Sequence, residues 1–236
     1  MNFTQSIFRN SWLFFVLILA SAFWGFWVTY FTRPDGTVSG WEHLHGAAMF
    51  GWCAMLIVQA SLIRTHRRSL HRATGKISVV LVPLIIYSTL WLANFRLNQR
   101  ALSDEGVYVL GLQLFLLLLF MIFYVQAMRH RARSDVHARW MICTSLTLLD
   151  PIFARVIGVN FIPAPLETMV AQYITFAMVD LILLALILRD LKTPSRKDVF
   201  LPALVMFVLA QAAMLLLWKT QAWSNFATWY AGLPMT

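Results

Sequence analysis

Residues 106–128 read GVYVLGLQLFLLLLFMIFYVQAM, and none of these 23 residues is Asp, Glu, Lys, Arg or His. An α-helix rises about 1.5 Å per residue, so about 20 apolar residues cross the roughly 30 Å hydrocarbon core of a bilayer. A spanning helix satisfies its own backbone hydrogen bonds, which lipid cannot do. The stretch therefore predicts a transmembrane helix.

Six further apolar runs of similar length occupy most of the chain. Sixty per cent of the 236 residues are apolar, only 12% are charged, and the mean hydropathy is +0.69. Soluble domains carry roughly 25% charged residues. The sequence therefore predicts an all-α integral membrane bundle of seven transmembrane helices, forming one domain over residues 1–236. The predicted spans are 12–31, 42–63, 76–95, 106–128, 140–158, 168–188 and 199–218.

Basic residues between the apolar runs predict the orientation. The N-terminal segment and the connections after the second, fourth and sixth runs hold 14 Lys and Arg residues, whereas the other connections and the tail hold four. Positively charged loops stay on the cytoplasmic side. We therefore expect the N-terminus in the cytoplasm and the C-terminus in the periplasm. The 14 residues are Arg9, Arg64, Arg67, Arg68, Arg72, Lys76, Arg129, Arg131, Arg133, Arg139, Arg189, Lys192, Arg196 and Lys197.

The same charge pattern indicates which partners to expect. A net charge of +9 in a soluble protein would favour nucleic acid, but here the basic residues lie in short loops between spans. The expected partners are the lipid bilayer and its anionic headgroups at the cytoplasmic loops, and no nucleic acid. In the tail, residues 219–236, Trp223, Phe226 and Tyr230 recur at helical spacing, which predicts a short helix at the periplasmic interface.

Glu42 and His45 are the first candidates for a metal site. They lie three residues apart at the start of the second run and therefore project toward one face of a helix. A carboxylate and an imidazole suit a transition metal, and a lone imidazole suits haem iron. The alternative is that both side chains only mark the membrane interface.

His71 and His137 are the second candidates. Each precedes an apolar run on the expected cytoplasmic side, so the two imidazoles share a depth. Two such groups on different helices suit haem or a transition metal. The neighbouring arginines leave open the alternative that these segments contact anionic headgroups or cap helices.

Asp150, Arg155 and Asp180 are ionisable residues inside predicted spans. A charge at this depth costs several kcal/mol unless it is paired or hydrated, so such residues are candidates for a functional site. Pro151 removes a backbone donor beside Asp150 and favours a polar pocket there. The expected partners come from other helices, with Gln113, Gln172 and Arg96 as candidates. The alternative is a purely structural pair.

Two short matches suggest an internal repeat. Val-Gln-Ala precedes a basic loop at residues 58–60 and again at residues 125–127, and a Ser and a His follow each time. These matches predict that the second and third helices and the fourth and fifth helices are repeated hairpins, as in several transporters.

Two segments carry a family resemblance: HLHGAAMFGWCAMLIVQASLIRTHRRSLHRATGK at residues 43–76 and DVHARWMICTSLTLLDPIFARVIG at residues 135–158. They resemble a family of bacterial multi-pass inner-membrane proteins in which a His opens the second helix and His-Arg-x-x-Gly and His-x-Arg-Trp-Met segments open later ones. The matching positions are His45, His71 and His137. The resemblance implies the same fold in the bacterial inner membrane, and it brings no established activity.

Three functions remain open from the sequence. The first is a membrane redox or metal-handling protein with haem or a transition metal at some of Glu42, His45, His71 and His137. The second is a small-molecule transporter or receptor-like bundle with a polar site at Asp150, Arg155 and Asp180. The third is a non-catalytic assembly or lipid-interacting protein. Soluble catalytic signatures such as a phosphate loop or His-Glu-x-x-His are absent from the sequence.

Overall fold

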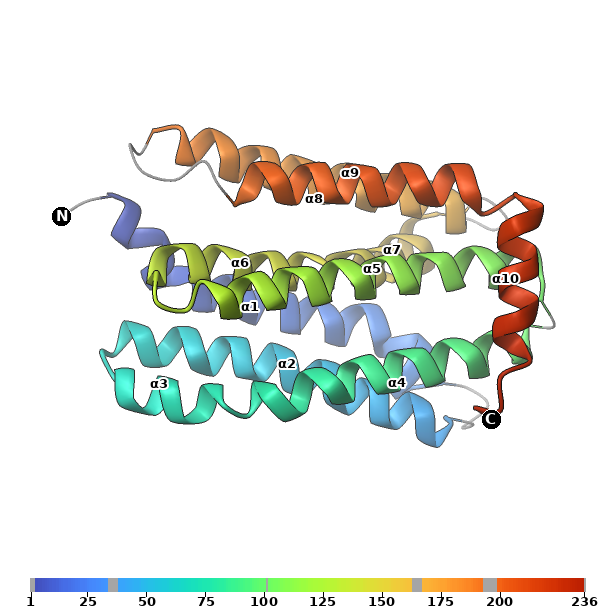
Figure 1. The fold of residues 1–236 in the computed structure, drawn as a ribbon, viewed down its shortest axis with the longest axis horizontal. Helices are drawn as coiled ribbons and strands as arrows, with labels where there is room; N and C mark the ends of the chain where they lie inside the picture. Colours follow the sequence, from blue (N-terminus) through green and yellow to red (C-terminus); the bar gives the residue numbers. More distant parts are fainter. Residues whose placement is uncertain (1–2, 34–37, 101, 163–166, 193–198, 236) are drawn as a thin grey trace.

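A computed structural model describes residues 3–33, 38–100, 102–162, 167–192 and 199–235, and all regular structure in these ranges is helical. Figure 1 shows the helices running side by side along one long axis, with the last helix lying across one end. The elements are α1 (Phe3–Phe26), the π-helical segment η1 (Trp27–Phe31), α2 (Gly40–Arg64), α3 (Arg68–Gly75), α4 (Ser78–Gln99), α5 (Asp104–Arg129), α6 (Ser134–Leu146), α7 (Leu149–Phe161), α8 (Glu167–Asp190), α9 (Phe200–Leu217) and α10 (Gln221–Ala231).

Seven helical segments are long and apolar enough to cross a membrane, which confirms the predicted number of spans. The third segment joins α3 to α4, and the fifth joins α6 to α7. The chain ends lie at opposite ends of the bundle (Figure 1). We call the end that carries α3 and the α5–α6 connection the basic end, and the opposite end the α10 end. The predicted hairpin repeat stays a prediction.

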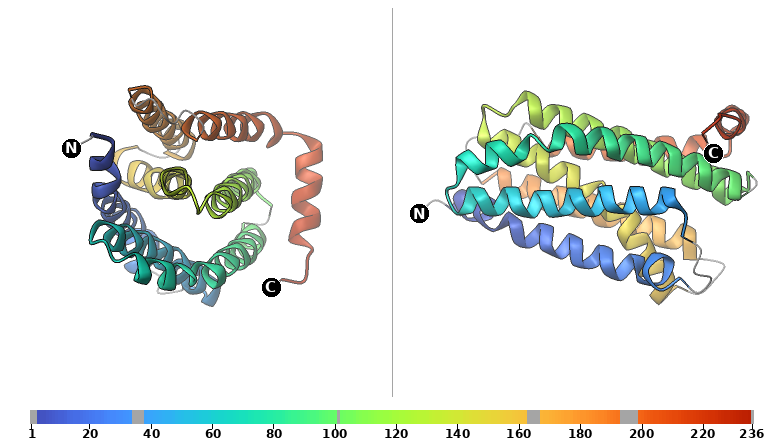
Figure 2. Two further views of the ribbon diagram at one scale, coloured as in Figure 1. Left: turned by 60° about the vertical axis from the view of Figure 1, so that its left-hand side comes forward. Right: turned by 90° about the horizontal axis from the view of Figure 1, so that it is seen from below.

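Helix packing places the segments in a defined order around the bundle. α1 packs against α2 and α7, α2 against α4, α5 against α6 and α9, and α7 against α8. Two views in Figure 2 show this arrangement from the side and from below. Gly25 sets the α1–α7 approach, because a Cβ there would lie 2.7 Å from the carbonyl oxygen of Ile152. Small residues at such contacts let spanning helices approach closely.

The fifth span is broken in the middle of the bundle. α6 ends at Leu146 and α7 begins at Leu149, which places Asp150 and Pro151 in the first turn of α7. A proline is tolerated there because the first-turn N–H groups have no partner within the helix. Asp150 therefore lies at the amino end of a half-helix, where the helix dipole favours a negative charge.

The tail forms the predicted short helix, α10, which closes the bundle across α4 and α5 (Figure 1). The buried Asn94 side chain donates to the Tyr230 carbonyl at 2.5 Å, and the Tyr230 hydroxyl donates to the Leu90 carbonyl at 2.6 Å. Burial raises the pKa of Tyr230 to about 12, so the phenol stays protonated and remains a donor at neutral pH. Trp223 adds a bond from its indole N–H to the Val107 carbonyl at 3.2 Å.

Candidate functional site

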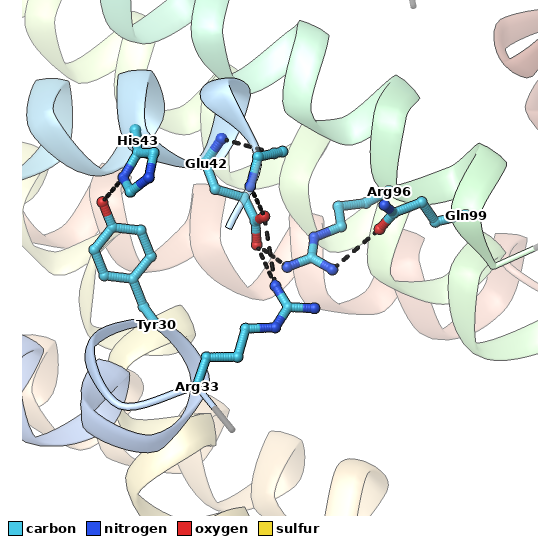
Figure 3. Close-up of polar contacts among 7 residues, drawn as sticks. Tyr30, Arg33, Glu42, His43, Arg96 and Gln99 are labelled. Atoms are coloured by element: carbon cyan, nitrogen blue, oxygen red, sulfur yellow. Dashed lines mark hydrogen bonds and ion pairs between the residues drawn. The ribbon is translucent and has the colours of Figure 1, made fainter. Parts of the chain in front are cut away.

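Glu42 lies at the centre of an ion-pair cluster at the α10 end (Figure 3). Its carboxylate accepts hydrogen bonds from Arg33, at 3.2 Å, and from Arg96. It also accepts the Ser39 backbone N–H at 2.8 Å, while the Ser39 hydroxyl accepts the Glu42 N–H at 3.2 Å. This reciprocal pair is a capping box at the start of α2. The carboxylate is therefore occupied by two guanidinium groups and a backbone donor.

His45 points to a different set of neighbours. Its Nδ1 lies 3.4 Å from the hydroxyl oxygens of both Ser88 and Thr89 on α4. The structure does not bring Glu42 and His45 onto one shared site, although they are three residues apart on α2. The reason is that two arginines from outside α2 surround Glu42. The adjacent His43 accepts the Tyr30 hydroxyl at 2.7 Å (Figure 3).

His71 and His137 meet at the basic end, although they come from α3 and α6. Their ring centroids lie 6.5 Å apart with an interplanar angle of 85°. His137 Nδ1 lies 2.8 Å from the Ala127 carbonyl oxygen, so this nitrogen carries the proton and donates. Gln59 on α2 accepts the Thr74 hydroxyl at 2.7 Å and the Gly75 N–H at 3.2 Å through its amide oxygen, and its amide nitrogen donates to the His71 carbonyl at 3.1 Å and to His71 Nδ1 at 2.5 Å. Both imidazoles are half-buried.

Asp150 is buried and bonded to two neutral side chains of α8. The Thr175 hydroxyl donates to it at 2.8 Å, and the Gln172 amide donates to the same carboxylate oxygen. Gln172 is thus one of the expected partners. Asp150 also lines a small, largely apolar cavity between α5, α7, α8 and α9, together with Gln211 and Met214.

Asp180 is separate from that cavity. It is half-buried and accepts a hydrogen bond from Gln211 at 3.1 Å, while the cavity wall on α8 is formed by its neighbour Val179 and by Phe176. The structure therefore links Asp150 and Asp180 only through Gln211. A one-residue offset on a helix turns a side chain by about 100°, so Asp180 projects away from the cavity wall that Val179 forms.

Arg155 lies one helical turn beyond Asp150 on α7. One of its guanidinium N–H groups donates to the Pro151 carbonyl at 2.7 Å, and the guanidinium carbon lies 4.6 Å from the centroid of the Phe26 ring. Among the described residues no carboxylate forms an ion pair with it.

Arg139 and Asp190 form a buried ion pair that the sequence analysis missed. Arg139 Nε and Nη2 donate to the two Asp190 oxygens at 2.8 and 2.9 Å. The prediction that Arg139 lies in a cytoplasmic loop is wrong, because this residue lies in α6 and is only 2% exposed. In the sequence, Asp190 indicates such a pair, because it is an acid at the end of a span whose other flanking charges are basic.

Comparison of the chain with protein-family models, with curated proteins and with solved structures found no match. The resemblance to bacterial inner-membrane proteins stays a prediction.

Proposed function

We propose that the protein is a membrane redox or metal-handling protein in which His71 and His137 hold a transition-metal centre, either a bound ion or haem iron. One observation carries the proposal: two imidazoles that are 66 residues apart in the sequence lie with their ring centroids 6.5 Å apart at one end of the bundle. Imidazole is a common ligand for Zn, Cu, Fe and Ni.

The hydrogen bond at the His137 ring favours ligation. Metal-binding histidines usually donate their second ring N–H to a carbonyl or carboxylate, which fixes the ring and leaves the other nitrogen free for the metal. His137 Nδ1 donates to the Ala127 carbonyl in this way, which leaves its Nε2 for a metal. His71 Nδ1 instead accepts the Gln59 amide N–H at 2.5 Å, so metal binding at His71 has to displace this hydrogen bond or the proton on Nε2.

The ring separation is close to what a shared metal needs. A metal–nitrogen bond is about 2.0–2.1 Å, so two imidazoles on one ion have ring centroids roughly 5–6 Å apart. The observed separation is 6.5 Å, and both rings are half-buried. A two-histidine centre leaves coordination positions open, which suits a redox centre or the transfer of an ion more than a closed structural site.

The test is metal and haem content of the full-length protein. It should be purified with a tag that contains no histidine from cells supplied with haem precursors and transition metals. We expect either a Soret band or a stoichiometric metal in elemental analysis, and these two readouts separate haem iron from a bound ion. His71→Gln combined with His137→Gln should remove the signal and leave the melting temperature in detergent within a few degrees.

Two other histidines at the same end supply a matched control. His130 is half-buried and bonds its own helix at the Gln126 carbonyl, and His66 is exposed with φ of 60°. The control variant is His130→Gln with His66→Asn, because Asn tolerates positive φ. This variant should keep the metal or haem. A wild-type protein with neither, or equal loss in the control, would contradict the proposal.

We also propose that the basic end faces the cytoplasm of a bacterial inner membrane, with its arginines near anionic lipid headgroups. The support is the basic asymmetry of the sequence together with the position of the α2–α3 and α5–α6 connections, which both lie at the end of the bundle opposite α10 (Figure 1).

A further inference from the structure

The carboxylate of Asp150 is deeply buried and forms no ion pair with the described residues. It lies 11 residues before the end of α7, about 16 Å along the helix axis, and is only 3% exposed. Thr175 and Gln172 both donate to one of its oxygens, Oδ1, and the other oxygen, Oδ2, accepts no hydrogen bond from the described residues. A charged group this deep in a membrane is usually paired, so half of the carboxylate remains available to a positive partner.

Arg155, the other charged residue of α7, does not occupy that position. It lies five residues beyond Asp150, so its side chain is turned by about 140° around the helix. Its guanidinium donates to the Pro151 carbonyl at 2.7 Å and lies over the Phe26 ring of α1. Asp150 is instead bonded to α8, and α7 packs against both α1 and α8. The two charges therefore face different neighbouring helices.

The side chains bonded to Asp150 carry oxygen atoms that suit a cation. The Thr175 hydroxyl oxygen lies 2.8 Å from Asp150 Oδ1 and 3.2 Å from the Gln172 amide nitrogen, so the three side chains form one compact cluster. An amide carries an oxygen as well as a nitrogen, and a half-turn about its last bond exchanges the two. After this rotation a carboxylate, a hydroxyl and an amide oxygen converge, and hard cations prefer such oxygen ligands.

The break in the fifth span adds a backbone oxygen close to this cluster. Thr147 lies four residues before Pro151, whose nitrogen carries no proton, so the Thr147 carbonyl lacks the donor that would continue a helix. Thr147 is itself buried, and it is only three residues before Asp150. In transporters, unwound backbone carbonyls at broken spanning helices hold small cations near the middle of the membrane.

A small cavity leaves room beside the carboxylate. Asp150 lines it together with Gln211 and apolar side chains of α5, α8 and α9, and its volume of about 20 Å³ admits about one water molecule. Tyr108 lies one helical turn before Leu112, a lining residue of α5, and its buried hydroxyl has no hydrogen-bond partner among the described residues. A buried polar atom without a partner indicates a water or an ion beside it.

We propose that Asp150, Thr175 and Gln172 form a binding site for an alkali-metal cation such as sodium. Asp150 supplies the negative charge, and the other two side chains supply neutral oxygens. A monovalent ion balances the single carboxylate, whereas a divalent ion would leave an uncompensated charge deep in the membrane. The ion is small, because the space beside the carboxylate admits only about one water molecule.

The cation site is separate from the centre proposed at His71 and His137. Those two residues belong to α3 and α6 at the basic end (Figure 1), whereas Asp150 lies in the first turn of α7 near the middle of the bundle. The ligand atoms differ as well, because imidazole nitrogens suit transition metals and oxygens suit hard cations.

The test measures binding of radiolabelled sodium to the purified full-length protein in a choline buffer, with lithium and potassium as competitors. We expect saturable binding of about one ion per chain, and a melting temperature that rises with sodium but not with choline, because a ligand of the folded state stabilises it. Asp150→Asn should weaken sodium binding by about tenfold or more, since cation affinity depends on ligand charge. Thr175→Val should also weaken it, whereas Thr175→Ser keeps the hydroxyl and should retain most of the affinity.

Asp180→Asn is the matched control. Asp180 is another acid within a span, and it bonds Gln211 at 3.1 Å without lining the cavity, so this variant should bind sodium like the wild type. The variant with both His71→Gln and His137→Gln should also bind sodium, which keeps the two proposals separable.

Three results would overturn the proposal. The first is no saturable binding of sodium, lithium or potassium to the wild type. The second is wild-type sodium affinity in Asp150→Asn or, if that variant does not fold, in Thr175→Val. The third is an equal loss of affinity in Asp150→Asn and Asp180→Asn, because only Asp150 belongs to the cluster.

Discussion

Arg139 and Asp190 make two parallel hydrogen bonds between α6 and α8 and are almost completely buried. A third N–H of Arg139 donates to the Asp135 carbonyl at 3.1 Å, and the Phe200 ring lies 6.0 Å from the guanidinium carbon. Such a pair recovers its desolvation cost only because both partners are present in good geometry. At the residue scale, therefore, each member of this pair depends on the other.

Asp190→Asn should destabilise the protein by about 3–5 kcal/mol, because it leaves the Arg139 charge buried without its carboxylate. The measurement is equilibrium unfolding in mixed detergent micelles. Glu105→Gln is the control, since it breaks the exposed Arg100–Glu105 pair and should change the free energy of unfolding by less than about 1 kcal/mol. Equal losses of unfolding free energy in the two variants would show that the buried pair stabilises the protein no more than the exposed pair does.

Asp150→Asn should leave the fold nearly unchanged. The Asn oxygen can still accept from Thr175 and Gln172, so the expected loss is within about 1 kcal/mol. Equilibrium unfolding in mixed detergent micelles checks this, and a loss of several kcal/mol would mean that the charge of Asp150 itself stabilises the bundle.

At the scale of the element, the break between α6 and α7 has a local cause. The hydroxyls of Thr144, Ser145 and Thr147 donate to carbonyls three residues back, at 2.7, 2.7 and 2.8 Å. Such bonds compete with the backbone ladder and bend helices, and Pro151 supplies no backbone N–H to restore it. Together these residues end α6 and start α7 within two residues.

Tyr230→Phe should loosen α10 from the bundle. The variant removes the phenol that donates to the Leu90 carbonyl at 2.6 Å, and the expected cost is about 1 kcal/mol. Limited proteolysis and equilibrium unfolding measure this. Tyr87→Phe is the matched control, because Tyr87 is 41% exposed and makes no hydrogen bond among the described residues. An unchanged free energy of unfolding in Tyr230→Phe would mean that the Asn94 and Trp223 contacts alone hold α10 against the bundle.

At the scale of the whole molecule, the number of spans could be predicted because it depends on local apolar content, as in residues 106–128. The shared depth of His71 and His137 could be predicted for the same reason, since both precede a span on one side. Which side chains from different helices lie together could not be predicted from the sequence. Glu42 is separated from His45 by Arg33 and Arg96, and Arg139 pairs with Asp190, because helices distant in sequence pack together and hydropathy does not report which helices are neighbours.

The orientation of the bundle gives the last prediction. Reporter fusions after Arg67, Arg131 and Lys197 should report the cytoplasm, and fusions after Asp35, Gln99, Pro163 and the C-terminus should report the periplasm. The physical reason is that translocating a loop dense in Lys and Arg is unfavourable, and without the buried Arg139 the expected cytoplasmic segments still hold 14 minus one, or 13, such residues against four in the others. Seven spans also require the two chain ends on opposite sides of the membrane.

A pair of reporters, one active only in the cytoplasm and one only in the periplasm, should give opposite signals at every fusion point. If every reporter gave the opposite result, the His71–His137 centre and the basic loops would lie in the periplasm. Headgroups of the inner leaflet could then not be partners of these loops. A cytoplasmic C-terminus with the other sites as expected would instead mean that one of the seven segments does not cross. Substituting Arg64, Arg67 and Arg68 by Gln should weaken the preference without reversing it, because most of the basic residues remain on that side.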